Sequence, residues 1–136
     1  RSSALLAAAE AEVAAMRRLP NIVLPFPGGV VRSGSKVGSK YPALGASTND
    51  AYCPSLRDLA ARSDLDAETG SVMEIVIDGL TDADVANAMR AGLKTLTERG
   101  AGSGLQRIGA GNYGGKLGPF LYHLRQLVPG APEAAA

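Results

Sequence analysis

The fold of this chain is decided by the stretch Val72-Met73-Glu74-Ile75-Val76-Ile77 and by the helix signals that follow it. Four of these six residues are β-branched, a composition typical of a β-strand. Thr81 then has the side chain of a helix N-cap, Asp84 follows three residues later, and Gly100 is a typical helix stop. We therefore expect a strand over residues 72–77 and an amphipathic helix from Thr81 to Gly100.

Upstream of this unit, apolar residues recur at helical spacing from Ser3 to Leu19, and Pro20 ends the predicted helix. Residues 22–24 are apolar and predict a short buried strand. Residues 25–54 are rich in Gly, Ser and Pro but retain apolar anchors, which indicates an ordered loop. Ordered loops of about 30 residues are uncommon in compact domains and usually bind a ligand.

Further elements are predicted after this loop. Pro54 stands at the first position of a short helix that reaches Arg62. Strands are expected over residues 106–110 and 120–125. This order of elements predicts the α+β class, with a mostly antiparallel sheet and helices packed on one face. The length of 136 residues is that of a single domain.

Charge and cysteine content exclude several classes of function. The 14 Lys and Arg residues are balanced by 13 Asp and Glu residues, which argues against binding to nucleic acid or to an anionic membrane surface. The apolar runs are far shorter than the ~20 residues that span a bilayer. With one cysteine, Cys53, and one histidine, His123, the chain predicts no metal site and fits a cytoplasmic location.

Several short motifs fail for lack of structural context. Residues 109–114 match the dinucleotide pattern G-x-G-x-x-G, but Gly115, Gly118 and Pro119 prevent the helix that this mechanism requires. Nucleotide binding is therefore only a distant alternative. Cys53 has no nearby group that would activate its thiol, so we interpret it as a small buried residue. His123, on a predicted strand, is interpreted as a structural histidine.

Glu74 is the more interesting candidate for catalysis. It alternates with Val72 and Val76, so these side chains share one face of an apolar strand. Partial desolvation there would suit a carboxyl group to general acid and base work near neutral pH. The alternative is a carboxylate on the solvent face of the sheet, and the pattern alone leaves both interpretations open.

The loop between the first two predicted strands contains a polar cluster. It interleaves Gly34 and Gly38 with two lysines and three serines: Lys36, Lys40, Ser33, Ser35 and Ser39. These residues could place ammonium groups and backbone N–H groups against an anionic or amide-rich ligand. Tyr41, Thr48 and Asn49 follow in the same loop. We favour a binding loop over a merely solvated basic loop.

Three stretches together resemble a known family. They are residues 25–29, residues 33–41 running on to 46–49, and residues 110–118; the segment 74–80 fits as well, in the same order and spacing. The combination resembles the C-terminal half of formylmethanofuran–tetrahydromethanopterin formyltransferase and covers about residues 15 to 125.

The resemblance implies a protein about twice this length with two similar lobes, each a ferredoxin-like sandwich. Residues 1–136 would be a single domain, the C-terminal (distal) lobe, and the N-terminal lobe would be absent. The start at Arg1, inside a helical pattern, fits a piece of a longer protein. The family transfers a formyl group between methanofuran and N5 of tetrahydromethanopterin, in formaldehyde oxidation or methanogenesis, and needs no metal or redox cofactor. Its members form homotetramers, and in methylotrophic bacteria they work with hydrolase subunits.

The same resemblance implies roles for particular residues. Glu74 matches the position of the proposed acid/base group, so we expect it to be catalytic. The residues expected to bind the two one-carbon carriers are Ser35, Lys36, Gly38, Ser39, Lys40, Tyr41, Ser47, Thr48, Asn49, Asn112, Tyr113 and Lys116. A site shared with the missing lobe would be incomplete, so we do not expect this chain to be sufficient for activity. The alternative is a non-catalytic lobe that assembles a formyltransferase/hydrolase complex.

Overall fold

The computed structural model describes residues 2–34, 36–43, 49–99, 101–112, 115 and 118–128. The helices are α1 (Ser2–Met16), α2 (Asp82–Arg99) and α3 (Leu124–Leu127), and the strands are β1 (Ile22–Val23), β2 (Val31–Arg32), β3 (Met73–Glu74) and β4 (Asp78–Gly79). Short 3-10 turns are η1 (Pro27–Gly29), η2 (Asp50–Tyr52), η3 (Pro54–Leu56) and η4 (Ala101–Ser103).

The strands form one antiparallel ribbon that is interrupted in the middle. β1 pairs with β4 and β2 pairs with β3, both antiparallel. The pairing continues at both ends, where Leu80 N–H donates to Asn21 O (3.0 Å) and Ser33 N–H donates to Val72 O (3.2 Å). Hence the segments 21–33 and 72–80 run beside each other along their length.

The interruption has a local cause in the sequence. Seven residues separate Val23 from Val31, whereas only three separate Glu74 from Asp78, so the first segment has four extra residues. The seven-residue segment contains Pro25 and Pro27, which have no backbone N–H to donate to a strand ladder. It also contains Gly28 and Gly29, whose φ values are positive (72° and 79°). The predicted strand over 72–77 is therefore paired as strand only at Met73–Glu74.

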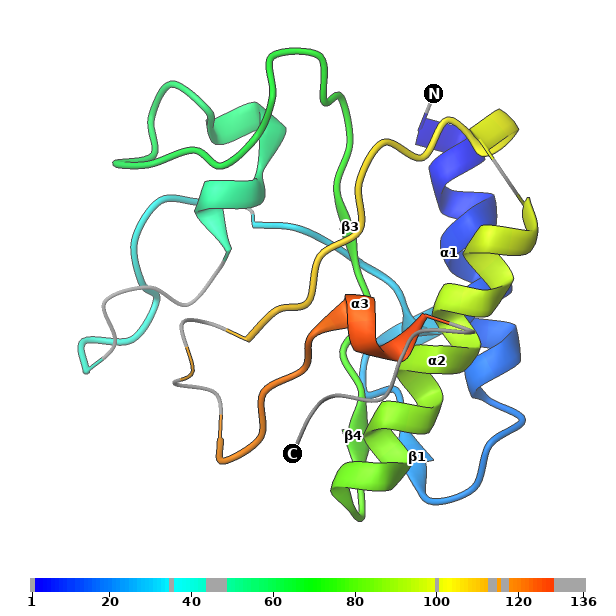
Figure 1. Ribbon diagram of the computed structural model, residues 1–136. Coiled ribbons are helices and arrows are strands. Elements are labelled where there is room, and N and C mark those ends of the chain that lie inside the picture. Colours follow the sequence, from blue (N-terminus) through cyan, green and yellow to red (C-terminus); the bar gives the residue numbers. More distant parts are fainter. Residues whose placement is uncertain are drawn as a thin grey trace.

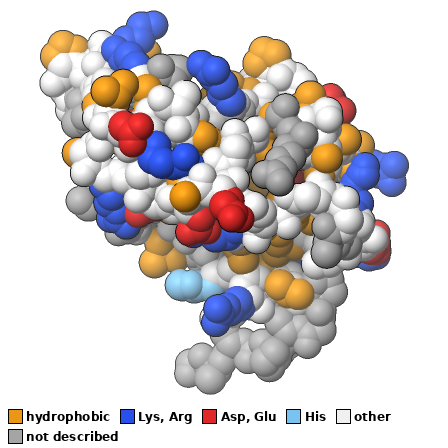
Figure 2. Space-filling model, turned by 90° about the horizontal axis from the view of Figure 1, so that it is seen from above, with side chains coloured by type: hydrophobic (Ala, Val, Ile, Leu, Met, Phe, Trp, Pro, Cys, Tyr) orange, Lys and Arg blue, Asp and Glu red, His pale blue; other side chains and the backbone are white. Residues whose placement is uncertain are grey.

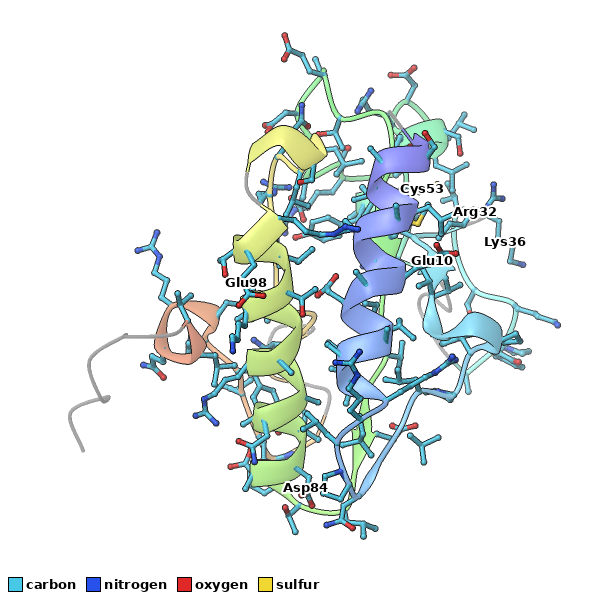
Figure 3. The ribbon with its side chains drawn as sticks, turned by 90° about the vertical axis from the view of Figure 1, so that its right-hand side faces the viewer. Glu10, Arg32, Lys36, Cys53, Asp84 and Glu98 are labelled. Atoms are coloured by element: carbon cyan, nitrogen blue, oxygen red, sulfur yellow. The ribbon has the colours of Figure 1, made fainter. Side chains whose placement is uncertain are left out.

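Helices α1 and α2 lie side by side, antiparallel, on one side of the ribbon (Figures 1 and 3). The buried side chains of the two helices are small or apolar: Ala8, Ala9, Val13, Met16, Ala88, Leu93 and Leu96. Gly92 allows the close approach, because a Cβ there would lie 2.5 Å from Met16 Cε and 2.8 Å from Glu12 Oε1. Much of the core is thus a helix pair rich in small residues.

The start of α2 confirms the predicted cap. Asp84 N–H donates to Thr81 Oγ1 (3.1 Å), and the Thr81 hydroxyl donates to Asp84 Oδ2 (2.8 Å). The helix spans Asp82–Arg99, close to the predicted range. The first helix, Ser2–Met16, is also close to its prediction.

Other local predictions are wrong. The helix from Pro54 is a single 3-10 turn, Pro54–Leu56. Residues 106–110 are not in a strand, and residues 120–125 run into the short helix α3, with His123 exposed at its N-cap. Strand formation requires a partner backbone, and the described part of the chain supplies none to these segments.

At the level of class, the architecture is α+β, with short antiparallel strand pairs and helices, as predicted. On the face that Figure 2 presents, Lys and Arg side chains are interspersed with Asp and Glu, in keeping with the balanced composition. Among the described helices, none has both the length and the apolar character that a membrane span requires.

Candidate active site around Glu74

Glu74 lies on the ribbon face that points away from the helices. Gly79 faces α2, because a Cβ there would lie 2.5 Å from Val85 Cγ2. Successive residues of an extended chain alternate between faces, so the even-numbered residues from Glu74 to Leu80 point to the other side. Exposure agrees: Val76 and Leu80 are exposed, whereas Ile75 and Ile77 are half-buried. Glu74 itself is half-buried.

Two side chains donate hydrogen bonds to one oxygen of Glu74. The Ser33 hydroxyl donates to Oε1 at 3.0 Å, and the Asn49 amide Nδ2 donates to the same oxygen at 2.6 Å. Ser33 is only 2% exposed and its Oγ also lies 3.2 Å from Asn49 O. The carboxylate therefore belongs to a small, half-buried polar cluster, which is neither the apolar face nor the solvent face that the strand pattern left open.

Close packing between two loop segments brings Asn49 to Glu74. Gly34 has φ +56°, and a Cβ there would lie 2.9 Å from both Asn49 O and Cys53 Cβ. The Cys53 thiol donates to Gly34 O at 3.4 Å, and Cys53 is 3% exposed, which confirms the interpretation of this residue as buried. A side chain at position 34 would separate the two segments.

Those predicted substrate-binding residues of the loop that the structure describes are exposed or half-buried. Ser39 and Tyr41 bond each other locally: Tyr41 N–H donates to Ser39 Oγ (2.9 Å) and the Ser39 hydroxyl donates to Tyr41 O (2.9 Å). Lys36, Lys40 and Tyr41 are exposed, and Gly38 has a positive φ of 79°. These three side chains thus lie at the surface of the loop.

The side chain of Asn112 binds the backbone of Tyr122, ten residues further along the chain. Its Nδ2 donates to Tyr122 O (2.7 Å) and its Oδ1 accepts from Tyr122 N–H (3.0 Å). The Tyr122 hydroxyl donates to Asp82 Oδ1 (2.8 Å) at the start of α2. Burial, together with the hydrogen bond and charge of Asp82, raises the pKa of Tyr122 to about 12. The side chain of Asn112 therefore makes structural contacts, and its predicted role in substrate binding remains a prediction.

The remaining predicted site residues lie outside the described residues: Ser35, Ser47, Thr48, Tyr113 and Lys116. Within the described ranges, His, Cys, Asp and Glu form no group of three or more that could hold a metal ion. Of the predicted site residues, the structure brings Glu74 and Asn49 together, and it adds Ser33 to them.

Sequence reasoning missed two features. Ser33 was recognised only as one serine of the loop cluster, although it pairs with Val72 and lies under Glu74; a register for residues 21–33 against 72–80 would have revealed it. Glu12 was not singled out, yet burial between α1 and α2 raises its pKa from 4.5 to about 7. Its burial depends on Gly92 of the other helix, which no local pattern signals.

Comparisons with known proteins show which family this chain resembles in sequence. The family model described as "FTR, proximal lobe" matches residues 1–127. The chain is 65% identical over 123 residues to a formylmethanofuran–tetrahydromethanopterin formyltransferase of Methylococcus capsulatus, covering 90% of this chain and 41% of that protein. The chain thus spans about two fifths of this relative's length.

Solved structures agree in fold. The formyltransferase/hydrolase complex of Methylorubrum extorquens, in complex with methylofuran, contains a chain that matches with a TM-score of 0.79 and 55% identity, over 93% of this chain and 41% of that one. A formylmethanofuran:tetrahydromethanopterin formyltransferase from Methanosarcina barkeri matches with a TM-score of 0.77 and 41% identity, over 93% and 42%.

Proposed function

We propose, because the chain belongs to the formylmethanofuran–tetrahydromethanopterin formyltransferase family, that it forms part of an enzyme that moves a formyl group between these two carriers. The observation that carries the proposal is the carboxylate of Glu74, held by Ser33 and Asn49 on the ribbon face that the helices leave uncovered. The substrates would be the two one-carbon carriers, methanofuran and tetrahydromethanopterin, with no tightly bound cofactor.

Formyl transfer between amines sets clear requirements for the site. The attacking amine must lose a proton as it adds to the formyl carbon, an oxyanion forms, and the departing amine must gain a proton. Glu74 would take the first proton and return it to the leaving amine. The exposed Lys36, Lys40 and Tyr41 would hold the long polar carriers, and the carboxylate would act where the formyl group is exchanged.

We further infer that the lobe is a ferredoxin-like sandwich in the whole protein. The order of elements supports this inference. Along the chain, α1 is followed by the two segments of the ribbon and then by α2, and both helices pack on one face of the ribbon. This α-β-β-α order is the middle part of a β-α-β-β-α-β ferredoxin-like arrangement. The resemblance implies a distal lobe, whereas the matching family model describes a proximal lobe. We therefore keep only the C-terminal position of this lobe as a proposal.

Assembly is the last part of this proposal. An N-terminal lobe of the same polypeptide, further copies in a tetramer, and hydrolase subunits would be the partners, supported by the coverage of two fifths of the relative and by the complex from Methylorubrum extorquens. The free, buried thiol of Cys53 is consistent with our inference of a cytoplasmic location.

Substitution of Glu74 by Gln in the formyltransferase polypeptide that contains this lobe tests the proposal. We expect kcat for formyl transfer to fall roughly 100- to 10,000-fold, the usual contribution of a general acid/base. Glu68→Gln, at an exposed glutamate of the same domain, is the matched control and should leave kcat unchanged. A normal kcat for Glu74→Gln would refute the catalytic role and favour an assembly lobe.

A further inference from the structure

We propose that Ser33 and Asn49 are positioning residues that fix Oε1 of Glu74 and leave Oε2 to exchange the proton. This inference rests on the proposed function of Glu74. It assigns Asn49 a different role from substrate binding, and it gives Ser33 a role that the sequence did not suggest.

Ser33 is held rigidly before it reaches the carboxylate. Its backbone N–H continues the β2–β3 ladder through Val72 O, and its side chain is buried. The hydroxyl has one hydrogen and two acceptors in reach, Glu74 Oε1 at 3.0 Å and Asn49 O at 3.2 Å. A charged acceptor forms the stronger bond, so the hydrogen is directed to Glu74.

Asn49 approaches from the other side of the cluster. Its backbone carbonyl accepts Tyr52 N–H at 3.1 Å at the start of η2, and the contact with Gly34 fixes this segment on the ribbon. Its Nδ2 donates to Oε1 at 2.6 Å. Thus Ser33 and Asn49, which lie 16 residues apart in the chain, both donate to Oε1 of Glu74.

The consequence is an asymmetric carboxylate. An oxygen of a carboxylate has two lone-pair sites, and at Oε1 both are occupied by donors. Both hydrogen bonds that the structure describes at this carboxylate end at Oε1, and neither involves Oε2. In the transfer, an N–H bond of the attacking amine breaks, the nitrogen keeps the electron pair, and an O–H bond forms at Oε2. The attacking nitrogen uses its lone pair to form the new bond to the formyl carbon, whose oxygen becomes an oxyanion. When the carbonyl re-forms, the bond between that carbon and the departing nitrogen breaks, its electron pair stays on the departing nitrogen, and the same proton passes from Oε2 to that nitrogen.

The experiment compares Ser33→Ala and Asn49→Ala in the formyltransferase polypeptide that contains this lobe. We expect kcat to fall roughly 10-fold in each variant, because each loses one hydrogen bond to a charged group, while KM for both carriers is unchanged. Ser63→Ala is the control for the serine, since the Ser63 hydroxyl is buried but has no hydrogen-bond partner among the described residues. Asn87→Ala, at an exposed position of α2, is the control for the amide.

A double-mutant cycle separates positioning from general structural support. If Ser33 acts through Glu74, adding Ser33→Ala to Glu74→Gln lowers kcat no further. A full additional 10-fold loss would overturn the positioning role. A raised KM with normal kcat in Asn49→Ala would make Asn49 a substrate contact and overturn its assignment. If Glu74→Gln keeps a normal kcat, the proposed function of Glu74 fails. If Glu74→Gln lowers kcat but Ser33→Ala and Asn49→Ala leave it normal, the proposed function stands and only the positioning role is overturned.

Discussion

Replacing Glu12 by Gln should stabilise the fold at alkaline pH and leave it unchanged at acidic pH. Glu12 lies where α1 meets α2, with Oε1 only 2.8 Å from the place where a Cβ of Gly92 would be. Burial raises the pKa of its carboxyl from 4.5 to about 7. The neutral amide of Gln has nearly the same shape, so the substitution removes the charge with little change in packing.

The sign follows from proton linkage. Below pH 4.5 the carboxyl is protonated in both the folded and the unfolded state, so burying the neutral group lowers the free energy of unfolding only slightly. As pH rises from 4.5 to about 7, the unfolded chain releases its proton first, so the free energy of unfolding falls. Each pKa unit corresponds to about 1.4 kcal/mol, but Glu12 keeps some contact with solvent, so we expect a loss of about 1–3 kcal/mol.

The assay is chemical denaturation of the 136-residue chain at pH 4.5 and pH 8, followed by circular dichroism. Glu12→Gln should raise the free energy of unfolding by about 1–3 kcal/mol at pH 8 and by much less at pH 4.5. Glu10→Gln, at an exposed glutamate in the same helix, is the control. An equal gain at both pH values, or a gain no larger than that of the control, would refute the reasoning.

Three further substitutions and treatments probe the fold. Gly34→Ala should lower the free energy of unfolding, measured by chemical denaturation, by about 1–3 kcal/mol more than Gly104→Ala does. Both glycines have a positive φ, but only at position 34 would an added Cβ lie within 4 Å of neighbouring atoms. An equal cost would show that the contact with the segment of Asn49 is unimportant. Thr81→Ala should lower the free energy of unfolding by about 1 kcal/mol through loss of the helix cap, which thermal denaturation measures, whereas Thr97→Ala at an exposed helix position should cost less. Cys53 should react with a thiol reagent only slowly until denaturant is added, because it is buried; rapid labelling of the native chain would contradict this.

Local signals were sufficient for the parts of the fold that local interactions form. Thr81 and Asp84 are three residues apart, so the start of α2 could be predicted from their side chains alone. Helix α1 could be predicted from its apolar spacing and Pro20. Strand predictions over 106–110 and 120–125 failed because a strand also needs a partner that sequence spacing does not reveal.

The candidate site shows the same division. The sequence singled out Glu74 by its position in an apolar strand, and placed Asn49 and Ser33 in one polar loop. Their roles relative to Glu74 depend on contacts across 25 and 41 residues, which the strand register and the close approach at Gly34 establish. For this reason the strand pattern could not choose between an apolar and a solvent-facing environment for Glu74, and the structure shows a hydrogen-bonded cluster.

By itself, the sequence determined helices α1 and α2, the class of the fold, the family resemblance and the choice of Glu74 as a candidate, because these depend on neighbouring residues or on short motifs. Only the tertiary structure decided that Oε1 of Glu74 receives two donors and that Glu12 is buried against Gly92. Both outcomes arise from the packing of segments distant in the chain, where a single glycine sets how closely two backbones approach.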